Sequence, residues 1–489
     1  MNKIFHWANQ NISLILIIGL AAFLRFYKLD LQSLWVDELF SANLSSPNLS
    51  FTEVLNNFKK TAHPPFYFIL LFLFTKIFGG TSIAIKSLSA ILGVLGVLSI
   101  YKLGKELLNK NIGIIASGLL AFNYFHIYYS QEARMYALLF LLATWSFYLL
   151  VKFIKEPSIR KAIYFGIFAS LVIHTHYFGL LILGAQISIL AYYVIIPYAI
   201  SRIKFIKYCC ISGLIIFISY LPVFKSLEGH SKGTSLWIPR VHYNSLQEVF
   251  ISFFGRSEVV VILIVITVLL FLIKISNLKN TKSFKLDPVN NKWVFSTVII
   301  MTWIVVGILI PVYRSNAKVP IIIDRYFIHL LTPILLMCSI GLYSIKNKVL
   351  RNGFLMTIVL FSLINLFYER WHYKGVYKSQ FRETCAYVEN YKNRDREAEK
   401  TKVVSPLGRH LVFYLPNENI NEIRLPGYLK ELKNDSSLIQ DFWYIDGHNN
   451  KFSVSKQEEI FLNNHFQLND SIDLFDAWAK LYVVKEQNE

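Results

Sequence analysis

The sequence predicts a polytopic α-helical membrane protein that ends in a small soluble α/β domain. Of its 489 residues, 54% are apolar and only 17% are charged, and the mean hydropathy is +0.43. Apolar runs recur from residue 12 to residue 367 and then stop, a composition typical of integral membrane proteins. The net charge of +19 comes from Lys and Arg in short loops between these runs. The positive-inside rule and anionic lipid account for this charge, so nucleic acid is not an expected partner.

Eleven apolar runs are predicted to cross the membrane, and one further run is too short to do so. The run at residues 66–78 holds 13 residues, which as a helix rise only about 20 Å, whereas the hydrocarbon core is about 30 Å thick. It is therefore predicted to be a juxtamembrane or re-entrant helix. The eleven predicted spans lie near residues 12–24, 88–101, 112–128, 136–153, 162–173, 178–198, 206–224, 259–273, 293–311, 327–345 and 354–367.

This treatment of residues 66–78 places all the basic loops on one side of the membrane, together with the N-terminus. By the positive-inside rule that side is the cytoplasm. The protein is therefore expected in the cytoplasmic (inner) membrane, with a first external loop at residues 25–87. The unusual polar residues of the loops then all fall on the external or periplasmic side, where they predict a single site: Asp37, Glu38, His63, Glu132, Arg134, His174, His176, Asp324 and Arg325.

Two domains are predicted from the change in composition near Glu369. Residues 1–368 form the transmembrane domain, and residues 369–489 form a soluble external α/β domain. Within the second domain, periodicity predicts helices at residues 381–391 and 456–464 and strands at residues 402–405 and 479–484.

The first external loop carries two groups that indicate an active site. Asp37 and Glu38 are adjacent carboxylates beside a membrane, which are costly to keep ionised unless water, a cation or a substrate meets them. A structural alternative is that the pair caps a loop helix or binds a surface lysine. His63 precedes Pro64 and Pro65, a sequence that starts a helix. The imidazole either contacts substrate or caps that helix.

The order and spacing of several short motifs resemble the GT-C fold glycosyltransferases that use polyprenyl-phosphate sugars. The resemblance is to the family 39 group, which contains protein O-mannosyltransferases and lipid A aminoarabinose transferases. It covers about three quarters of the chain and implies a glycosyltransferase of the cell envelope. The motifs are Arg25-Phe26-Tyr27, Trp35-Val36-Asp37-Glu38, His63-Pro64-Pro65, Tyr129-Ser130-Gln131-Glu132-Ala133-Arg134-Met135-Tyr136, His174-Thr175-His176-Tyr177 and Asp324-Arg325-Tyr326.

The resemblance implies transfer of a sugar from an undecaprenyl- or dolichyl-phosphate carrier to an acceptor hydroxyl, with inversion at the sugar. This reaction needs a base for the hydroxyl proton and positive charge for the departing phosphate. Asp37 is predicted to be the base, and Glu38 to support it or to hold a cation. The acceptor is a protein, lipid or glycan hydroxyl, and neither it nor the sugar can be read from the sequence.

Three arginines are candidates for binding the donor phosphate. Arg325 ranks first, because a planar guanidinium donates two parallel hydrogen bonds to a phosphate. An ion pair with Asp324 or snorkelling to the interface is the alternative for this side chain. Arg134 and Arg256 rank second.

Glu132 stands where relatives often have Asp, and its role is left open between metal ligand, sugar contact and ion pair with Arg134. His174 and His176 lie two residues apart, which is a poor metal signature alone. A divalent cation held by Glu132, His174 and His176 is one alternative, and hydrogen bonding at the outer end of the span is the other. No other cofactor is expected.

Three tyrosines are further candidates for the substrate pocket: Tyr136, Tyr177 and Tyr326. The chain has 28 tyrosines, so anchoring at the membrane interface explains such positions equally well. Two other functions are alternatives to the transferase. A polyprenyl-lipid flippase or transporter would also be polytopic, but no internal repeat is evident. An assembly protein that acts through its soluble tail would not depend on Asp37, Glu38 or Arg325.

Overall fold

The computed structural model describes residues 11–58, 61, 63–231, 238, 240–280, 286–317, 319–394 and 399–485. Contacts between residues divide the chain into two compact units. The first unit comprises Met1–Lys28, Ser50–Leu71 and Lys86–Tyr373, and the second comprises Leu29–Leu49, Phe72–Ile85 and Lys374–Glu489. The predicted division at residues 368 and 369 stays a prediction. The first unit ends at Tyr373, and two parts of the predicted first external loop, Leu29–Leu49 and Phe72–Ile85, belong to the second unit.

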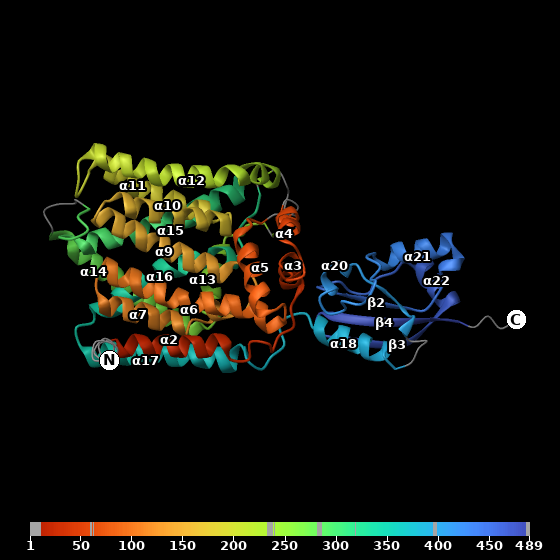
Figure 1. Ribbon diagram of the computed structural model, residues 1–489. Coiled ribbons are helices and arrows are strands. Elements are labelled where there is room, and N and C mark those ends of the chain that lie inside the picture. The colour runs from red at the N-terminus through yellow and green to blue at the C-terminus, as the bar shows by residue number, and fades with distance from the viewer. Residues whose placement is uncertain are drawn as a thin grey trace, which may run out of the picture. The chain divides into compact units, whose positions relative to one another are not determined.

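Helices make up the first unit, although Phe72–Ile85, which holds the second half of one helix and the start of the next, belongs to the second unit; the long helices run side by side (Figure 1). They are α2 (Ile12–Phe26), α4 (Phe51–Phe58), α5 (Phe66–Phe78), α6 (Ser82–Leu107), α7 (Lys110–Ala121), α8 (Tyr124–Ser130), α9 (Tyr136–Lys155), α10 (Ile159–Thr175), α11 (Gly179–Ile195), α12 (Arg202–Ser231), α13 (Ser245–Ser252), α14 (Glu258–Ser276), α15 (Lys292–Ala317), α16 (Leu331–Ser344) and α17 (Lys348–Ile364). Short 3-10 segments, η1 (Asn277–Asn280) and η2 (Asp324–Leu330), and a π-helical turn, η3 (Asn365–Glu369), complete the set. Helix α10 packs against α9 and α12, α14 against α16, and α7 against α2 and α16.

The predicted apolar runs coincide with these helices, and residues 66–78 form α5 as expected. Among the described residues, seven helices are long and apolar enough to cross a membrane, or eight if α7 and α8, which meet at a bend of 66°, count as one span. Three shorter apolar helices, α2, α5 and α11, accompany them. The multi-pass membrane architecture is confirmed, while the count of eleven crossings is not, because several predicted runs fold into helices of fewer than 18 residues.

The junction of α2, α7 and α8 is built around a buried guanidinium. Arg25, near the end of α2, is fully buried. It donates hydrogen bonds to the carbonyls of Ala21, Leu120 and Ala121 at 3.1 to 3.2 Å, and lies 2.8 Å from Nδ1 of His126. The last carbonyls of a helix lack partners within the helix. Arg25 binds those of α7 and also contacts His126, and thereby holds the bend between α7 and α8.

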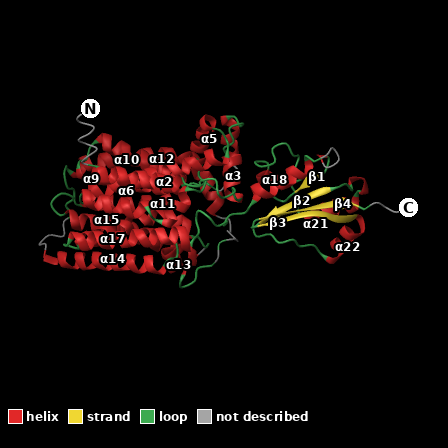
Figure 2. Cartoon of the chain, turned by 90° about the horizontal axis from the view of Figure 1, so that it is seen from below, coloured by secondary structure: helices red, strands yellow, loops and turns green. Residues whose placement is uncertain are grey.

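The second unit contains a four-stranded sheet flanked by helices. Its strands are β1 (Lys402–Val404), β2 (Phe442–Gly447), β3 (Phe466–Leu474) and β4 (Ala477–Val484), in the order β1-β2-β4-β3 (Figure 2). Strands β1 and β2 are parallel, whereas β4 is antiparallel to both of its neighbours. Its helices include α18 (Phe381–Lys392), α20 (Gly408–Leu411), α21 (Leu425–Asn434), α22 (Lys456–His465) and the one-turn η4 (Ser436–Leu438).

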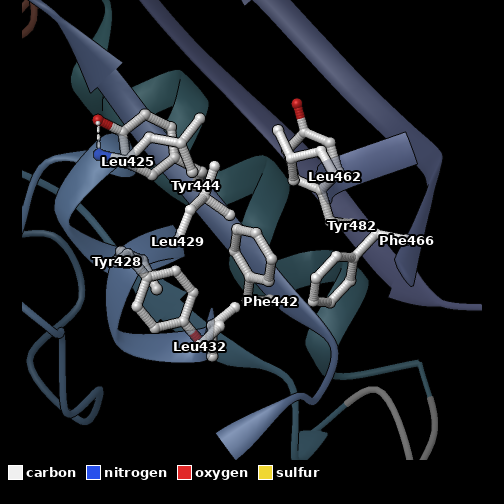
Figure 3. Close-up of a cluster of buried hydrophobic side chains, with 10 residues drawn as sticks. Leu425, Tyr428, Leu429, Leu432, Phe442, Tyr444, Leu462, Phe466 and Tyr482 are labelled. Carbon is white, nitrogen blue, oxygen red and sulfur yellow. Dashed lines mark hydrogen bonds between the residues drawn. The ribbon is translucent and has the colours of Figure 1, made fainter. Parts of the chain in front are cut away.

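Alternation along β2 places successive side chains on opposite faces of the sheet. Phe442 and Tyr444 face a cluster from α21, α22 and the neighbouring strands, and Tyr444 accepts a hydrogen bond from the Leu425 amide at 3.2 Å (Figure 3). Trp443 packs on the other face, where its ring contacts Tyr387 and Tyr391 of α18. The small α/β module predicted from the sequence is therefore confirmed, with helices on both faces of its sheet.

Helix α3 (Val36–Leu44) also belongs to the second unit. It follows Trp35 in the motif that carries the two adjacent carboxylates. The next residue, Ser45, accepts a hydrogen bond through its carbonyl from the hydroxyl of Thr75 in α5 at 2.8 Å. Short helix α20 packs against α3, so the acidic pair is placed on a helix that the C-terminal residues support.

Candidate active site

The turn between α8 and α9 holds two buried charged side chains. Glu132 is 1% exposed and Arg134 is 2% exposed. Charged residues are seldom buried to this degree unless they are paired or functional. The Arg134 amide donates to the carbonyl of Glu132 at 2.7 Å, which closes the turn tightly just before α9 begins at Tyr136.

Arg134 meets the His-Pro-Pro turn that opens α5. Its Nη2 lies 3.3 Å from Nε2 of His63. A guanidinium only donates hydrogen bonds, so Nε2 of His63 acts as the acceptor and the ring is neutral in this arrangement. Pro65 precedes the helix, and its carbonyl accepts the Ile69 amide at 3.0 Å. The predicted helix start at Pro-Pro is confirmed, and the imidazole contacts an arginine of the second motif.

Arg325 lies among aromatic rings at the start of η2. Its guanidinium carbon is 5.9 Å from the ring centroid of Tyr136 and 6.0 Å from that of Tyr326. These distances are within the range of cation–π attraction. Asp324 Oδ1 accepts the backbone amide of Arg325 at 2.7 Å, which stabilises the turn. Tyr136, Arg325 and Tyr326, predicted from two separate motifs, are thus neighbours.

His176 joins the same group from the turn between α10 and α11. Its ring centroid is 4.8 Å from that of Tyr326 and 6.3 Å from that of Tyr136. Burial lowers the pKa of His176 to about 3, and the positive charges of Arg134 and Arg325 contribute to this lowering. Two arginines therefore lie near one buried neutral imidazole. We refer to His63, Arg134, Tyr136, His176, Arg325 and Tyr326 as the arginine–tyrosine cluster.

The geometry around the two histidines gives little support to a metal site. Nδ1 of His176 accepts the Phe178 amide at 3.1 Å, which leaves the ring proton on Nε2. His174 instead lies against Tyr220, with ring centroids 6.4 Å apart, and Tyr177, which follows the two histidines, is half-buried. Among the described residues, no group of three or more His, Cys, Asp and Glu side chains is arranged to hold a metal ion.

A cavity of about 200 Å³ in the first unit is lined by aromatic and charged side chains. Tyr129 connects this cavity to the arginine–tyrosine cluster, because its ring centroid is 5.0 Å from that of Tyr136. Arg256, predicted to bind phosphate, lines the cavity and forms an ion pair of 2.6 Å with the half-exposed Glu248. The lining residues are Tyr124, Phe125, Tyr128, Tyr129, Ser252, Gly255, Arg256, Asp324 and Arg370.

Asp37 and Glu38 lie in the first turn of α3, in the second unit. Glu38 is fully buried and forms an ion pair of 2.8 Å with the buried Lys378. Its Oε2 also accepts the Trp35 amide at 3.4 Å. Glu38 therefore caps a helix and binds a lysine, although the lysine is buried rather than on the surface. Asp37 remains partly exposed.

His410 of α20 lies in the electrostatic field of Asp37. Burial lowers the pKa of His410, and the carboxylates of Glu422 and Asp37 act in the opposite direction. Asn43 of α3 donates a hydrogen bond of 2.6 Å to the carbonyl of Arg409. The acidic turn is thus surrounded by groups from the C-terminal part of the chain.

Three buried or cavity-lining charged side chains were missed by sequence reasoning. Lys378 was unmarked because its partner Glu38 is 340 positions away. Arg370 lines the cavity and donates to the Gly255 carbonyl at 2.5 Å, yet it follows the last apolar run, where basic residues are common. Lys86 is fully buried in α6. Its position within an otherwise apolar helix was the one available signal, since a buried lysine is rare.

Comparisons with known proteins agree with this architecture. Residues 62–224, about a third of the chain, match the protein family described as dolichyl-phosphate-mannose-protein mannosyltransferase. Among proteins with curated descriptions, none matches the sequence. Solved structures match over most of the chain. ArnT from Cupriavidus metallidurans in the apo state has a TM-score of 0.61 at 10% identity, covering 96% of this chain and 97% of that chain.

The same protein bound to undecaprenyl phosphate has a TM-score of 0.57 at 10% identity, with 96% and 98% covered. The oligosaccharyltransferase AglB from Archaeoglobus fulgidus, in complex with an inhibitory peptide and a dolichol-phosphate, has a TM-score of 0.55 at 11% identity, covering 90% of this chain and 70% of that one. At such identity the structures show a shared fold alone, and the family match over residues 62–224 agrees with it. The chain is a membrane glycosyltransferase with the GT-C fold, similar to the protein O-mannosyltransferase and ArnT group.

Proposed function

We propose that this chain transfers a sugar from a polyprenyl-phosphate carrier to an acceptor hydroxyl on the external or periplasmic face of the cytoplasmic membrane. The observation that carries the proposal is the arginine–tyrosine cluster, in which Arg325 lies beside Tyr136 and Arg134 stands two residues before Tyr136 in a buried turn. Two guanidinium groups within a largely apolar unit suit the phosphate of a lipid whose isoprenoid chain anchors it in the membrane. The structures of ArnT with undecaprenyl phosphate and AglB with a dolichol-phosphate support a donor of this class.

In the proposed reaction the acceptor oxygen attacks the anomeric carbon of the donor sugar. The bond between that carbon and the phosphate oxygen breaks, and polyprenyl phosphate leaves with the electron pair. Arg325 stabilises the charge on this phosphate, with Arg134 and Arg256 as further donors. In-line attack inverts the configuration at the anomeric carbon.

Asp37 is the proposed base, and it takes the proton from the acceptor hydroxyl as the new bond forms. Its partial exposure at the first turn of α3 leaves the carboxylate accessible to a substrate. The positive end of the helix dipole also favours a carboxylate at this position. Glu38 supports Asp37 from within the fold, because its own carboxylate is engaged with Lys378.

The remaining predicted residues are proposed to line the substrate pocket. Tyr136 and Tyr326 offer aromatic faces beside Arg325. Glu132 is buried in the turn before Tyr136, and Tyr177 follows the histidine pair. An apolar groove of about 630 Å³ between α10, α11 and α12 would hold part of the isoprenoid chain; it is lined mainly by aliphatic side chains, including Ile173, Leu180 and Leu183.

The test is sugar transfer by the purified protein in nanodiscs, supplied with a panel of polyprenyl-phosphate sugars. Release of polyprenyl phosphate from at least one donor supports the transferase. Comparison of the release rates with and without EDTA decides whether a metal takes part. Transbilayer movement of a fluorescent polyprenyl phosphate without sugar release from any donor would instead favour the flippase. The control is Arg325→Met, which should suppress release while leaving the protein folded.

A further inference from the structure

The buried ion pair between Glu38 and Lys378 is the starting point. Nζ of Lys378 is 2.8 Å from Oε2 of Glu38, and the two side chains are 5% and 0% exposed. The same carboxylate oxygen accepts the Trp35 amide, so the first turn of α3 is fixed from two directions. Taking two charges out of water costs free energy that can exceed their mutual attraction, and removal of one partner leaves the other as an uncompensated buried charge.

Other contacts from the C-terminal segment hold the residues just before α3. The Arg382 guanidinium donates to the carboxylate and the carbonyl of Asp30, each at 3.0 Å. The Tyr414 hydroxyl accepts the Leu34 amide at 2.8 Å. These groups fix the backbone on the N-terminal side of the acidic pair, while Lys378 contacts the pair itself.

We propose that Lys378 is a positioning residue for catalysis, which acts through Glu38 to hold the carboxylate of Asp37 in its working orientation. Asp37 directly precedes Glu38 in the first turn of α3, so a rotation of this turn that follows loss of the ion pair also turns Asp37. The inference rests on the proposed role of Asp37 as base. It assigns the C-terminal segment a part in the chemical step, in addition to any role in recognising the acceptor.

The chain offers a matched control within the same unit. Lys392 of α18 is also buried, and its Nζ lies 2.7 Å from Oε2 of Glu418. It donates to the Thr401 carbonyl at 2.7 Å as well. Lys392→Met therefore removes a buried lysine and its ion pair from the same module without touching α3. Loss of stability alone should affect both variants.

The experiment compares steady-state sugar transfer by the full-length protein in nanodiscs for Lys378→Met, Lys378→Arg, Lys392→Met and Asp37→Asn, well below each variant's unfolding temperature. We expect Lys378→Met to lower kcat at least tenfold with the KM for the lipid donor within twofold of wild type. Lys378→Arg should recover most of the rate, and Lys392→Met should keep a kcat within threefold of wild type.

Equal kcat values for Lys378→Met and Lys392→Met, with Asp37→Asn inactive, would overturn the positioning role while leaving the proposed base intact. An active Asp37→Asn would overturn the proposed base, and the inference with it. If Lys378→Met fails to fold, the charge-exchanged pair Glu38→Lys with Lys378→Glu serves instead. That variant must fold and must exceed the single substitution Glu38→Lys in kcat for the proposal to stand.

Discussion

The guanidinium of Arg134 lies 3.3 Å from Nε2 of His63, and these residues are 71 positions apart in the sequence. The contact joins the His-Pro-Pro turn to the buried turn before α9. It gives His63 a definite role as a hydrogen-bond acceptor for an arginine of the arginine–tyrosine cluster. Because a guanidinium cannot accept a hydrogen bond, the tautomer of His63 is also determined.

Replacing His63 by Ala is expected to destabilise the fold and weaken donor binding. The substitution leaves the buried Arg134 without this acceptor, and a hydrogen bond to a charged group contributes about 1.5–3 kcal/mol. His63→Gln places an amide oxygen near the position of Nε2 and should restore most of both properties. Thermal unfolding in detergent and the KM for the donor are the measurements. An alanine variant that matches wild type in both would refute this role.

Arg325→Met is expected to weaken binding of polyprenyl phosphate by about tenfold to a hundredfold, the equivalent of about 1.5–3 kcal/mol. Arg325→Lys should recover only part of the affinity, since an ammonium lacks the planar fork that binds two phosphate oxygens. The exposed Arg314 supplies the control variant Arg314→Met. Affinity is measured by titrating the lipid into nanodiscs. Equal affinity of the two methionine variants would exclude Arg325 as the phosphate ligand.

Arg25 is expected to matter for folding rather than for substrate binding. Arg25→Met removes the side-chain donor to the carbonyls of Ala21, Leu120 and Ala121, and the loss of hydrogen bonds from a buried charged group costs about 1–3 kcal/mol. The variant should unfold at a clearly lower temperature, yet the fraction that remains folded should keep the wild-type donor KM. A change in KM without a change in unfolding temperature would place Arg25 in the substrate site instead.

The first unit should become less stable as the pH is lowered, and His176 should contribute to this loss. Burial lowers its pKa from an ordinary value of 6.5 to about 3 in the folded protein. Above pH 6.5 the ring is neutral in both states and has no effect on stability. Between about pH 6.5 and 3 the unfolded chain binds the proton while the folded chain does not, so folding is progressively disfavoured.

His176→Asn keeps an acceptor for the Phe178 amide but does not titrate in this range. Its unfolding temperature should therefore decline less steeply than that of wild type between pH 6.5 and 4. Parallel pH profiles of the two proteins would contradict the buried, neutral state of His176.

Local patterns predicted much of the fold. The predicted helices at 381–391 and 456–464 are α18 and α22, and the predicted strands are β1 and β4. Strand β2 was missed because both of its faces are buried, so that burial does not alternate along it. Strand β3 was missed because most of its residues are polar and exposed. Periodicity detects a strand when one face is apolar and the other is polar, and neither β2 nor β3 shows this contrast.

The site was predicted less completely, for a physical reason. Residue type and position relative to the spans marked Arg134, Tyr136, His176, Arg325 and Tyr326, which the fold brings together. The pairing of Glu38 with Lys378 depends on tertiary structure and leaves no local pattern.

The most direct test of the account is the turnover of Asp37→Asn in nanodiscs with a polyprenyl-phosphate sugar that wild type accepts. The control is Glu53→Gln. Glu53 lies in the same predicted external loop, and its exposed carboxylate caps α4 by accepting the Ser50 amide. The account predicts that Asp37→Asn loses at least a hundredfold in kcat, in line with the contribution of a general base, while it binds the donor with wild-type affinity and Glu53→Gln keeps its activity. Turnover by Asp37→Asn at the rate of Glu53→Gln would contradict it.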